Sequence, residues 1–197
     1  MKQIVIASNN AGKLREIAAI LAPLGIKPVA QADFNVPEAE EPYPTFVENA
    51  LTKARNAAHH TGMPALADDS GICVEALGGA PGVLSARYGG EPKSDERNNQ
   101  KLVAALANEP NRRAYYYAAL VLVRHENDPQ PLIAEGVWRG EVVLEARGAG
   151  GFGYDPYFFL PAQGQTAAEL APELKNKISH RALALQRLAA LLKEQPL

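Results

Sequence analysis

The stretch Met63-Pro64-Ala65-Leu66-Ala67-Asp68-Asp69-Ser70-Gly71 joins an apolar run to two adjacent carboxylates and a Ser-Gly pair. The apolar run predicts a buried strand, and Ser70-Gly71 predicts a turn directly after it. The ends of buried strands are where α/β proteins usually keep their ligand-binding residues. We therefore expect Asp68 and Asp69 to lie at a turn on the functional edge of a sheet.

Asp68 and Asp69 repel each other and lose hydration beside an apolar interior, so their charges need compensation. A divalent cation, a basic neighbour or a bound proton supplies it. The pair therefore suggests a metal site. The alternative is structural: one Asp hydrogen-bonds the turn backbone as an Asx-turn, and the other caps a following segment. The two residues alone leave both interpretations open.

The segments around this stretch alternate between strand and helix patterns. Ile4–Ala7 predicts a buried strand, and a helix follows until Pro23 and Gly25. A second helix starts at a Thr45/Glu48 capping box and ends at Gly62. The remaining expected elements are a helix from about Asp95 to Ala107 capped by Ser94, strands at Tyr115–Val123, Leu132–Trp138 and Glu141–Leu144 with turns at Pro129 and Gly140, and a helix from about Ser179.

The composition is that of an ordinary soluble globular protein. The chain has 197 residues, of which 47% are hydrophobic and 21% charged, enough for one sizeable core. The net charge of −2 gives no long-range attraction to nucleic acid or anionic lipid, and no apolar run is long enough to span a bilayer. Cys73 is the only cysteine, and Met1–Ile4 lacks the apolar stretch of a signal peptide, so we expect a cytoplasmic protein without nucleic-acid or membrane partners.

The segment Ser8-Asn9-Asn10-Ala11-Gly12-Lys13 connects the first strand to the first helix. Free backbone N–H groups and the positive end of the helix dipole point at such a turn, which favours a bound anion. Lys13 adds a mobile cation, and Gly12 allows close approach to the backbone. The turn is not a Walker A loop, because Leu14 occupies the position of the metal-binding Ser or Thr.

An acidic connection runs from Asp33 to Pro44 and includes Glu38, Glu40 and Glu41. Its prolines predict an extended, irregular segment that can carry ligands. On the helix that follows, we expect the basic residues Lys53 and Arg55 to be solvated.

Two further segments combine ligand-binding residue types. In Lys175-Asn176-Lys177-Ile178-Ser179-His180-Arg181, the basic residues at a helix start oppose the helix dipole unless an anion or a ligand carbonyl lies nearby. The alternative is that Arg181 pairs with a glutamate and His180 is a surface cap. In 150–156, glycines alternate with Phe152 and Tyr154, which either stack on a base or pack in the core beside Phe158 and Phe159.

Five motifs in this order resemble the Ham1/RdgB family of inosine/xanthosine triphosphate pyrophosphatases. They are Ser8-x-Asn10-x-x-Lys13, Ala67–Gly71, Pro81-Gly82 with Ser85–Tyr88, Gly151–Pro156 and Ile178–Arg181. The resemblance covers about positions 4 to 192. It implies one α/β domain over 1–197 with a long central mixed sheet flanked by helices, two lobes around a substrate cleft, a homodimer, and Mg²⁺-dependent conversion of ITP, dITP or XTP to the monophosphate and pyrophosphate.

The resemblance also implies roles for individual residues. Asp69 resembles the catalytic carboxylate that also serves the metal, and either Glu40 or Glu41 resembles a second metal ligand. The substrate contacts that it implies are Ser8, Asn9, Asn10, Ala11, Gly12, Lys13, Ser70, Phe152, Gly153, Tyr154, Asp155, Lys175, His180 and Arg181. Asn9 is a departure, because glycine or another residue often stands at that position of the family.

The implied reaction is attack of water on the α-phosphorus with departure of pyrophosphate, so charge develops on oxygens that Mg²⁺ and Lys13 are suited to neutralise. A free Asp, with a pKa near ~3.9, is a poor base at neutral pH, so Asp69 should gain basicity from Asp68 or orient water on the metal. Donors from His180 or Arg181 would favour a 6-keto purine over adenine. The competing hypotheses are a Maf-like pyrophosphatase for pyrimidine or modified nucleotides, and a nucleotide-binding module without turnover.

Overall fold

The computed structural model describes residues 2–197 and divides the chain into two compact units. Unit 1 comprises the chain up to Asp69, residues 118–136 and Arg181–Leu197; unit 2 comprises Ser70–Tyr117 and Val137–His180. The chain therefore passes from one unit to the other inside a strand, between Asp69 and Ser70.

Seven strands form one sheet in the order β2-β1-β3-β4-β5-β6-β7. Their bounds are Lys2–Ile6 (β1), Ile26–Ala30 (β2), Ala65–Val74 (β3), Arg113–Val123 (β4), Leu132–Val142 (β5), Phe158–Leu160 (β6) and Gln165–Thr166 (β7). β1 pairs in parallel with β2 and β3, whereas β6 pairs antiparallel with β5 and β7. The expected mixed sheet flanked by helices is confirmed.

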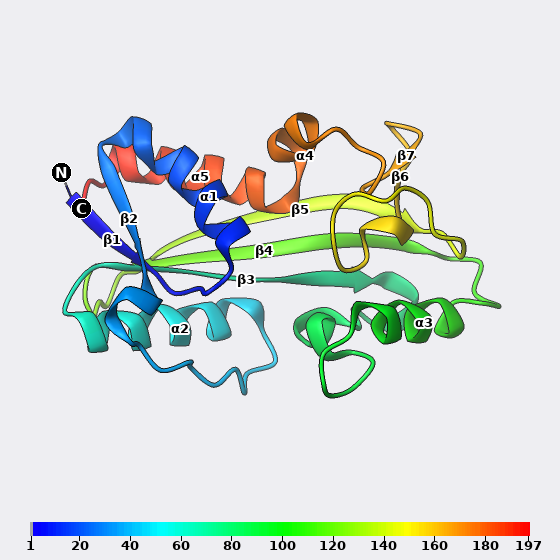
Figure 1. The fold of residues 1–197 in the computed structure, drawn as a ribbon, viewed down its shortest axis with the longest axis horizontal. Coiled ribbons are helices and arrows are strands. Elements are labelled where there is room, and N and C mark those ends of the chain that lie inside the picture. The colour runs from blue at the N-terminus through cyan, green and yellow to red at the C-terminus, as the bar shows by residue number, and fades with distance from the viewer. Residues whose placement is uncertain (1) are drawn as a thin grey trace. The chain divides into compact units, whose positions relative to one another are not determined.

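Helices cover both faces of the strands in unit 1 (Figure 1). They are α1 (Ala11–Leu21), α2 (Phe46–Thr61) and α5 (His180–Glu194). One apolar cluster joins Ile4 and Ile6 to α1 and α5, and a second joins Val5 and Ala67 to the buried alanines of α2. The alternation follows from strand geometry, in which successive side chains point to opposite faces.

Unit 2 has its own core. It is formed by the parts of β3, β4 and β5 that belong to this unit, together with β6, α3 and several aromatic side chains. α3 (Asp95–Ala105) contributes Leu102, and α4 is a short helix at Pro172–Ile178. Tyr116, Trp138 and Phe158 pack ring against ring at the centre of this cluster.

The expected helix ends at Thr45, Gly62 and Ser94 are confirmed. Thr45 Oγ1 accepts from the N–H of Glu48, Ser94 Oγ accepts from the N–H of Arg97, and Gly62 ends α2 with a φ of 66°. The C-terminal helix expected from about Ser179 is confirmed as α5, which starts at His180, and the short helix α4 before it was not expected. None of the helices in residues 2–197 is both long and apolar enough to cross a membrane.

Two turns expected from the sequence are instead parts of strands. β3 continues through Asp68, Asp69, Ser70 and Gly71 to Val74, so the carboxylates are interior strand residues and neither forms an Asx-turn there. Gly140 lies inside β5, where its missing side chain lets the carbonyl oxygen of Phe159 approach to 2.5 Å from the place of a Cβ atom. In both places, strand pairing overrides the local turn signal.

Candidate active site

The turn after β1 and the carboxylates of β3 meet because the two strands are parallel neighbours. Ile6 is paired with Leu66, and the N–H of Ala7 donates to the Leu66 carbonyl at 2.9 Å. β1 then ends, while β3 continues into Asp68 and Asp69. The turn Ser8–Lys13 therefore leaves the sheet beside the carboxylate pair, and all of these residues belong to unit 1.

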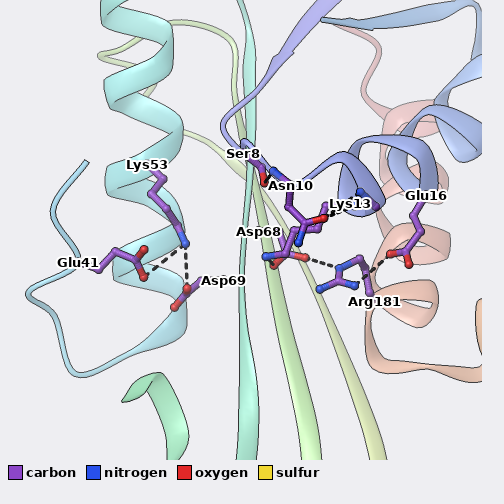
Figure 2. Close-up of polar contacts among 10 residues, drawn as sticks. Ser8, Asn10, Lys13, Glu16, Glu41, Lys53, Asp68, Asp69 and Arg181 are labelled. Carbon is purple, nitrogen blue, oxygen red and sulfur yellow. Dashed lines mark hydrogen bonds and ion pairs between the residues drawn. The ribbon is translucent and has the colours of Figure 1, made fainter. Parts of the chain in front are cut away.

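Asp68 points toward α1 and α5, where two cations bind it (Figure 2). Lys13 Nζ lies 2.7 Å from Asp68 Oδ1, and Arg181 Nε lies 2.7 Å from Asp68 Oδ2. Arg181 also bonds Glu16 Oε2 at 3.0 Å, so acidic and basic groups alternate through four side chains. Burial alone would raise the pKa of Asp68, but Lys13 and Arg181 outweigh it and hold that pKa well below its usual range. Asp68 is therefore ionised throughout the physiological range.

Asp69 points to the opposite side of β3, toward α2 (Figure 2). Lys53 Nζ of α2 lies 2.8 Å from Asp69 Oδ1 and 3.6 Å from Glu41 Oε2. Two carboxylates thus share one ammonium group. Glu41 contacts Lys53, whereas Glu40 is exposed. The geometry therefore favours Glu41 over Glu40 as the second carboxylate beside Asp69, a choice that the sequence left open. The expectation that Lys53 is solvated is wrong, since only 15% of its side chain is exposed.

The electrostatic state of Asp69 differs from that of Asp68. Burial raises the pKa of Asp69 to about 6, and Glu41 and Asp68 add to the increase against the lowering effect of Lys53. Its Oδ2 atom is buried and has no hydrogen-bond partner among residues 2–197. A buried carboxylate oxygen without a partner is costly, so this atom is suited to receive a water proton or a cation.

The residues around Asp69 fit a magnesium ion. Within the described residues, no group of three or more His, Cys, Asp or Glu side chains is placed to hold a metal ion. Mg²⁺ in nucleotide-dependent enzymes is commonly bound by one or two carboxylates, with substrate phosphates and water completing the octahedron. Asp69, with its unpartnered Oδ2, and Glu41 supply such a carboxylate pair.

The turn Ser8–Lys13 is more internally bonded than the sequence suggested. Asn10 Oδ1 accepts from the N–H groups of Gly12 at 2.8 Å and Lys13 at 3.2 Å, and Ser8 Oγ accepts from the N–H of Asn10. The expectation that these N–H groups are free is therefore wrong. Lys13 is not a mobile cation either, because it is paired with Asp68. Asn10 satisfies the helix end with its oxygen, which leaves its Nδ2 group as the end that can bind an anion.

Asn9 is tied to a separate element of unit 1. Gln31 Nε2 donates to Asn9 Oδ1 at 3.2 Å, and Gln31 is buried in a short 3₁₀ helix, Gln31–Phe34. The side chain of Asn9, the position where the sequence departs from the family pattern, is thus fixed by a hydrogen bond from Gln31. Ala11 begins α1 directly after Asn10.

The glycine and aromatic segment belongs to unit 2, and the structure separates its two aromatic residues. Tyr154 is buried in the core and its hydroxyl donates to the Ser85 carbonyl at 2.7 Å, whereas Phe152 is 63% exposed. Packing is therefore the role of the Tyr154 ring, and Phe152 is the ring available for stacking. Asp155 Oδ2 accepts from the Phe152 N–H, and a Cβ atom on Gly151 would lie 2.1 Å from that oxygen.

The basic C-terminal segment is divided between the two units. In unit 2, Lys175 pairs with Asp155 and lies over the Phe152 ring, and His180 is stacked on Tyr116 with ring centroids 4.7 Å apart. Arg181 belongs to unit 1, where it binds Asp68 and Glu16. The structure thus confirms pairing of Arg181 with a glutamate and contradicts the idea of His180 as a surface cap, since His180 is buried. Ser70 is half-buried in β3.

Sequence comparison identifies the family of the chain. The model of the Ham1 family matches residues 4–191. The chain belongs to the Ham1 family. A relative named dITP/XTP pyrophosphatase, from Nitrosomonas europaea, is 66% identical over 98% of this chain and 96% of that protein. A protein of the same name from Chromobacterium violaceum is 64% identical over 97% of each chain.

A solved structure of a Ham1 protein from Coxiella burnetii has the same fold. Its TM-score is 0.95 at 50% sequence identity, and the match covers 98% of this chain and 100% of that one. The resemblance to the Ham1 family that the five motifs indicated is therefore confirmed, together with the mixed sheet flanked by helices that it implied.

Three residues at this Ham1 site were not expected from the sequence: Lys53, Glu16 and Gln31. Lys53 had a usable signal, because it lies three residues after Ala50 and four before Ala57, on the buried stripe of α2. A lysine on a buried stripe needs a partner carboxylate. Glu16 and Gln31 had no such signal, since their partners Arg181 and Asn9 are set by tertiary packing.

Proposed function

We propose that this chain hydrolyses the non-canonical purine nucleoside triphosphates ITP, dITP and XTP to the monophosphate and pyrophosphate, which removes them from the nucleotide pool before incorporation into DNA or RNA. Its family membership and the names of its relatives support this activity. The observation that carries the proposal is Asp69, a buried carboxylate with a raised pKa and an unpartnered oxygen beside Glu41 and Lys53.

The triphosphate is bound by the turn Ser8–Lys13 in this proposal. The first turn of α1, Ala11-Gly12-Lys13, contains no acidic residue, so the positive end of its dipole is not neutralised there. Lys13 already bridges from this turn to Asp68, which keeps the ammonium group at the turn rather than in solvent. A phosphate oxygen can share Lys13 with Asp68, because an ammonium group has three donors.

Hydrolysis at the α-phosphorus forms a bond to the water oxygen and breaks the bond to the oxygen that bridges to the β-phosphate. Asp69 orients the attacking water and accepts its proton, and its burial, which raises its pKa to about 6 when no metal ion is bound, makes it a stronger base than a free Asp. Lys53 holds Asp69 Oδ1 in place, so that Oδ2 faces the water. Mg²⁺, when held by Asp69 and Glu41, supplies charge neutralisation on the phosphate oxygens.

The purine base is bound by residues of unit 2. Phe152 supplies an exposed stacking surface, Gly153 allows the chain to turn beside it, and Asp155, Lys175 and His180 supply polar side chains in the same unit. A 6-keto purine accepts at O6 and donates at N1, whereas adenine has the opposite pattern. Each mismatched polar group costs about 1–3 kcal/mol, so two mismatches exclude ATP by on the order of a hundredfold or more.

Pyrophosphate release from a nucleotide panel tests this function. The purified protein is assayed with ITP, dITP, XTP, GTP, ATP, UTP and dUTP, each with Mg²⁺ and with EDTA. We expect turnover of the first three that requires Mg²⁺. Equal turnover of ATP and ITP contradicts the base selection, preference for UTP or dUTP indicates a Maf-like activity, and nucleotide binding without pyrophosphate indicates a binding module.

Hydrolysis in ¹⁸O-labelled water identifies the phosphorus that is attacked. Attack at the α-phosphorus places the label in the nucleoside monophosphate. Label in pyrophosphate would instead mean attack at the β-phosphorus and would contradict the proposed placement of the water at Asp69.

The chain acts as a homodimer in the cytoplasm in this proposal, as the family resemblance and the lone Cys73 lead us to expect. Light scattering on the purified protein tests the dimer directly: a mass near twice that of the 21.1 kDa chain supports it, and a monomer mass refutes it.

A further inference from the structure

Two side chains of α3 hold the backbone of a single residue, Gly153, in the glycine and aromatic segment. Asp95 Oδ2 accepts from the N–H of Gly153 at 2.8 Å, and Asn99 Nδ2 donates to the Gly153 carbonyl at 2.9 Å. Asp95 and Asn99 are four residues apart, so they lie on one face of the helix. Both polar groups of one glycine are thereby fixed from a rigid element within unit 2.

Gly153 is the point at which the segment changes from exposed to buried. Phe152, on one side, is 63% exposed, and Tyr154, on the other, is buried in the core. Gly153 has a φ of 62°, in the left-handed region. Core packing anchors Tyr154, and the N–H of Phe152 is held by Asp155 Oδ2. The α3 clamp fixes Gly153 between them, so it contributes to the direction in which Phe152 leaves the core.

The buried side chain of Asn99 lowers the stability of the fold. It is only 8% exposed, and its Oδ1 atom has no hydrogen-bond partner within residues 2–197. An apolar residue would avoid this buried acceptor. The donor that Asn99 provides to Gly153 is the feature that an apolar residue cannot replace.

We propose that Asp95 and Asn99 are positioning residues for base recognition: they hold Gly153 so that Phe152 presents its ring to the purine. This inference rests on the proposed role of Phe152 in binding the base. Asp95 and Asn99 act through Gly153 and do not themselves contact the reacting atoms.

The neighbouring residue Asn98 offers a matched control. It is 2% exposed, and it clamps a different segment, accepting from the N–H of Gly89 at 2.6 Å and donating to the Ala86 carbonyl at 3.1 Å. Asn98 and Asn99 are the same residue type, on the same helix, with the same kind of backbone contact. Only Asn99 contacts the segment that carries Phe152.

The test compares Asn99→Leu with Asn98→Leu by steady-state kinetics on the Mg²⁺-loaded full-length protein. We expect Asn99→Leu to raise the KM for ITP about tenfold, the effect of one lost hydrogen bond, with kcat changed less than twofold. Asn98→Leu should leave that KM within about twofold. Competitive inhibition by inorganic tripolyphosphate, which has no base, should be unchanged in Asn99→Leu, whereas general damage to the fold would weaken it.

Asn99→Asp keeps the size of the side chain and replaces the NH2 donor by a carboxylate oxygen, which cannot donate to the Gly153 carbonyl, so it provides a second test if the leucine variant does not fold. Equal rises in KM for the Asn98 and Asn99 variants overturn the proposal, as does loss of tripolyphosphate inhibition together with ITP binding. Phe152→Ala separates the two hypotheses. If it raises the KM while the Asn99 variants do not, the positioning role is wrong; if it leaves the KM unchanged, the base-binding role of Phe152 is wrong as well.

Discussion

Asp68 and Asp69 lie on opposite faces of β3 and have opposite electrostatic surroundings. Asp68 is bound by two cations, Lys13 and Arg181, and its pKa is held well below the usual range. Asp69 shares one cation, Lys53, with Glu41, and burial raises its pKa to about 6. On the first side, two cations balance two carboxylates, Asp68 and Glu16, whereas on the second a single cation serves two carboxylates.

This difference follows from strand geometry. Because successive side chains of a strand point to opposite faces, adjacent residues meet different helices and do not share partners. Asp68 meets α1 and α5, and Asp69 meets α2 (Figure 2). A saturated carboxylate is suited to hold structure, and an under-compensated one is suited to bind a cation or accept a proton. We therefore propose that Asp68 supports the structure and that Asp69 carries the chemistry.

The substitution Asp69→Asn should have the largest effect on activity. It keeps the size of the side chain but removes the carboxylate that we propose as proton acceptor and metal ligand, so we expect kcat for ITP to fall by about 10³-fold or more. Binding of ITP, measured by calorimetry, should remain within a few fold of the wild type. Near-normal turnover in this variant would remove Asp69 from the catalytic role.

Lys53→Met should have the next largest effect. It removes the charged hydrogen bond that holds Asp69 Oδ1, and a bond of this kind contributes about 1.5–3 kcal/mol, so kcat should fall by roughly 10- to 100-fold. Arg55→Met, on the exposed side of the same helix, is the matched control and should retain activity. Similar losses in both variants would mean that the effect comes from α2 as a whole.

Glu41→Gln should have a smaller effect, confined to the metal. The Mg²⁺ concentration for half-maximal activity should rise on the order of tenfold, while kcat at saturating Mg²⁺ changes less. Glu40→Gln alters the adjacent, exposed glutamate and should leave the Mg²⁺ requirement unchanged. The reverse result would show that Glu40, and not Glu41, serves the metal.

Local sequence signals were sufficient for the helix ends at Thr45, Gly62 and Ser94, where side chain and backbone groups a few residues apart decide the outcome. They failed at Asp68 and Asp69, because two carboxylates followed by Ser-Gly have the composition of a turn. The partners that allow both to remain in a buried strand are distant in sequence: Lys53 is 16 residues from Asp69, and Arg181 is 113 residues from Asp68.

Strand β2 was missed for a related reason. Its Pro28 argues against a strand, but β2 is at the edge of the sheet, where a missing N–H group is tolerated. At the site, residue types and order indicated Asp69, Lys13 and Phe152. Arg181 belongs to unit 1 and His180 to unit 2, and Glu41, but not Glu40, lies beside Lys53. These differences between neighbouring residues depend on tertiary geometry that no local pattern contains.

The free energies of unfolding of Asp68→Asn and Asp69→Asn, measured side by side by urea denaturation at neutral pH, test the division of roles most directly. Asp68→Asn leaves Lys13 and Arg181 without their buried carboxylate and should lower stability by about 3 kcal/mol. Asp69→Asn removes a charge that burial disfavours, so stability should stay unchanged or rise slightly. Equal losses in the two variants, or a larger loss for Asp69→Asn, would contradict the account.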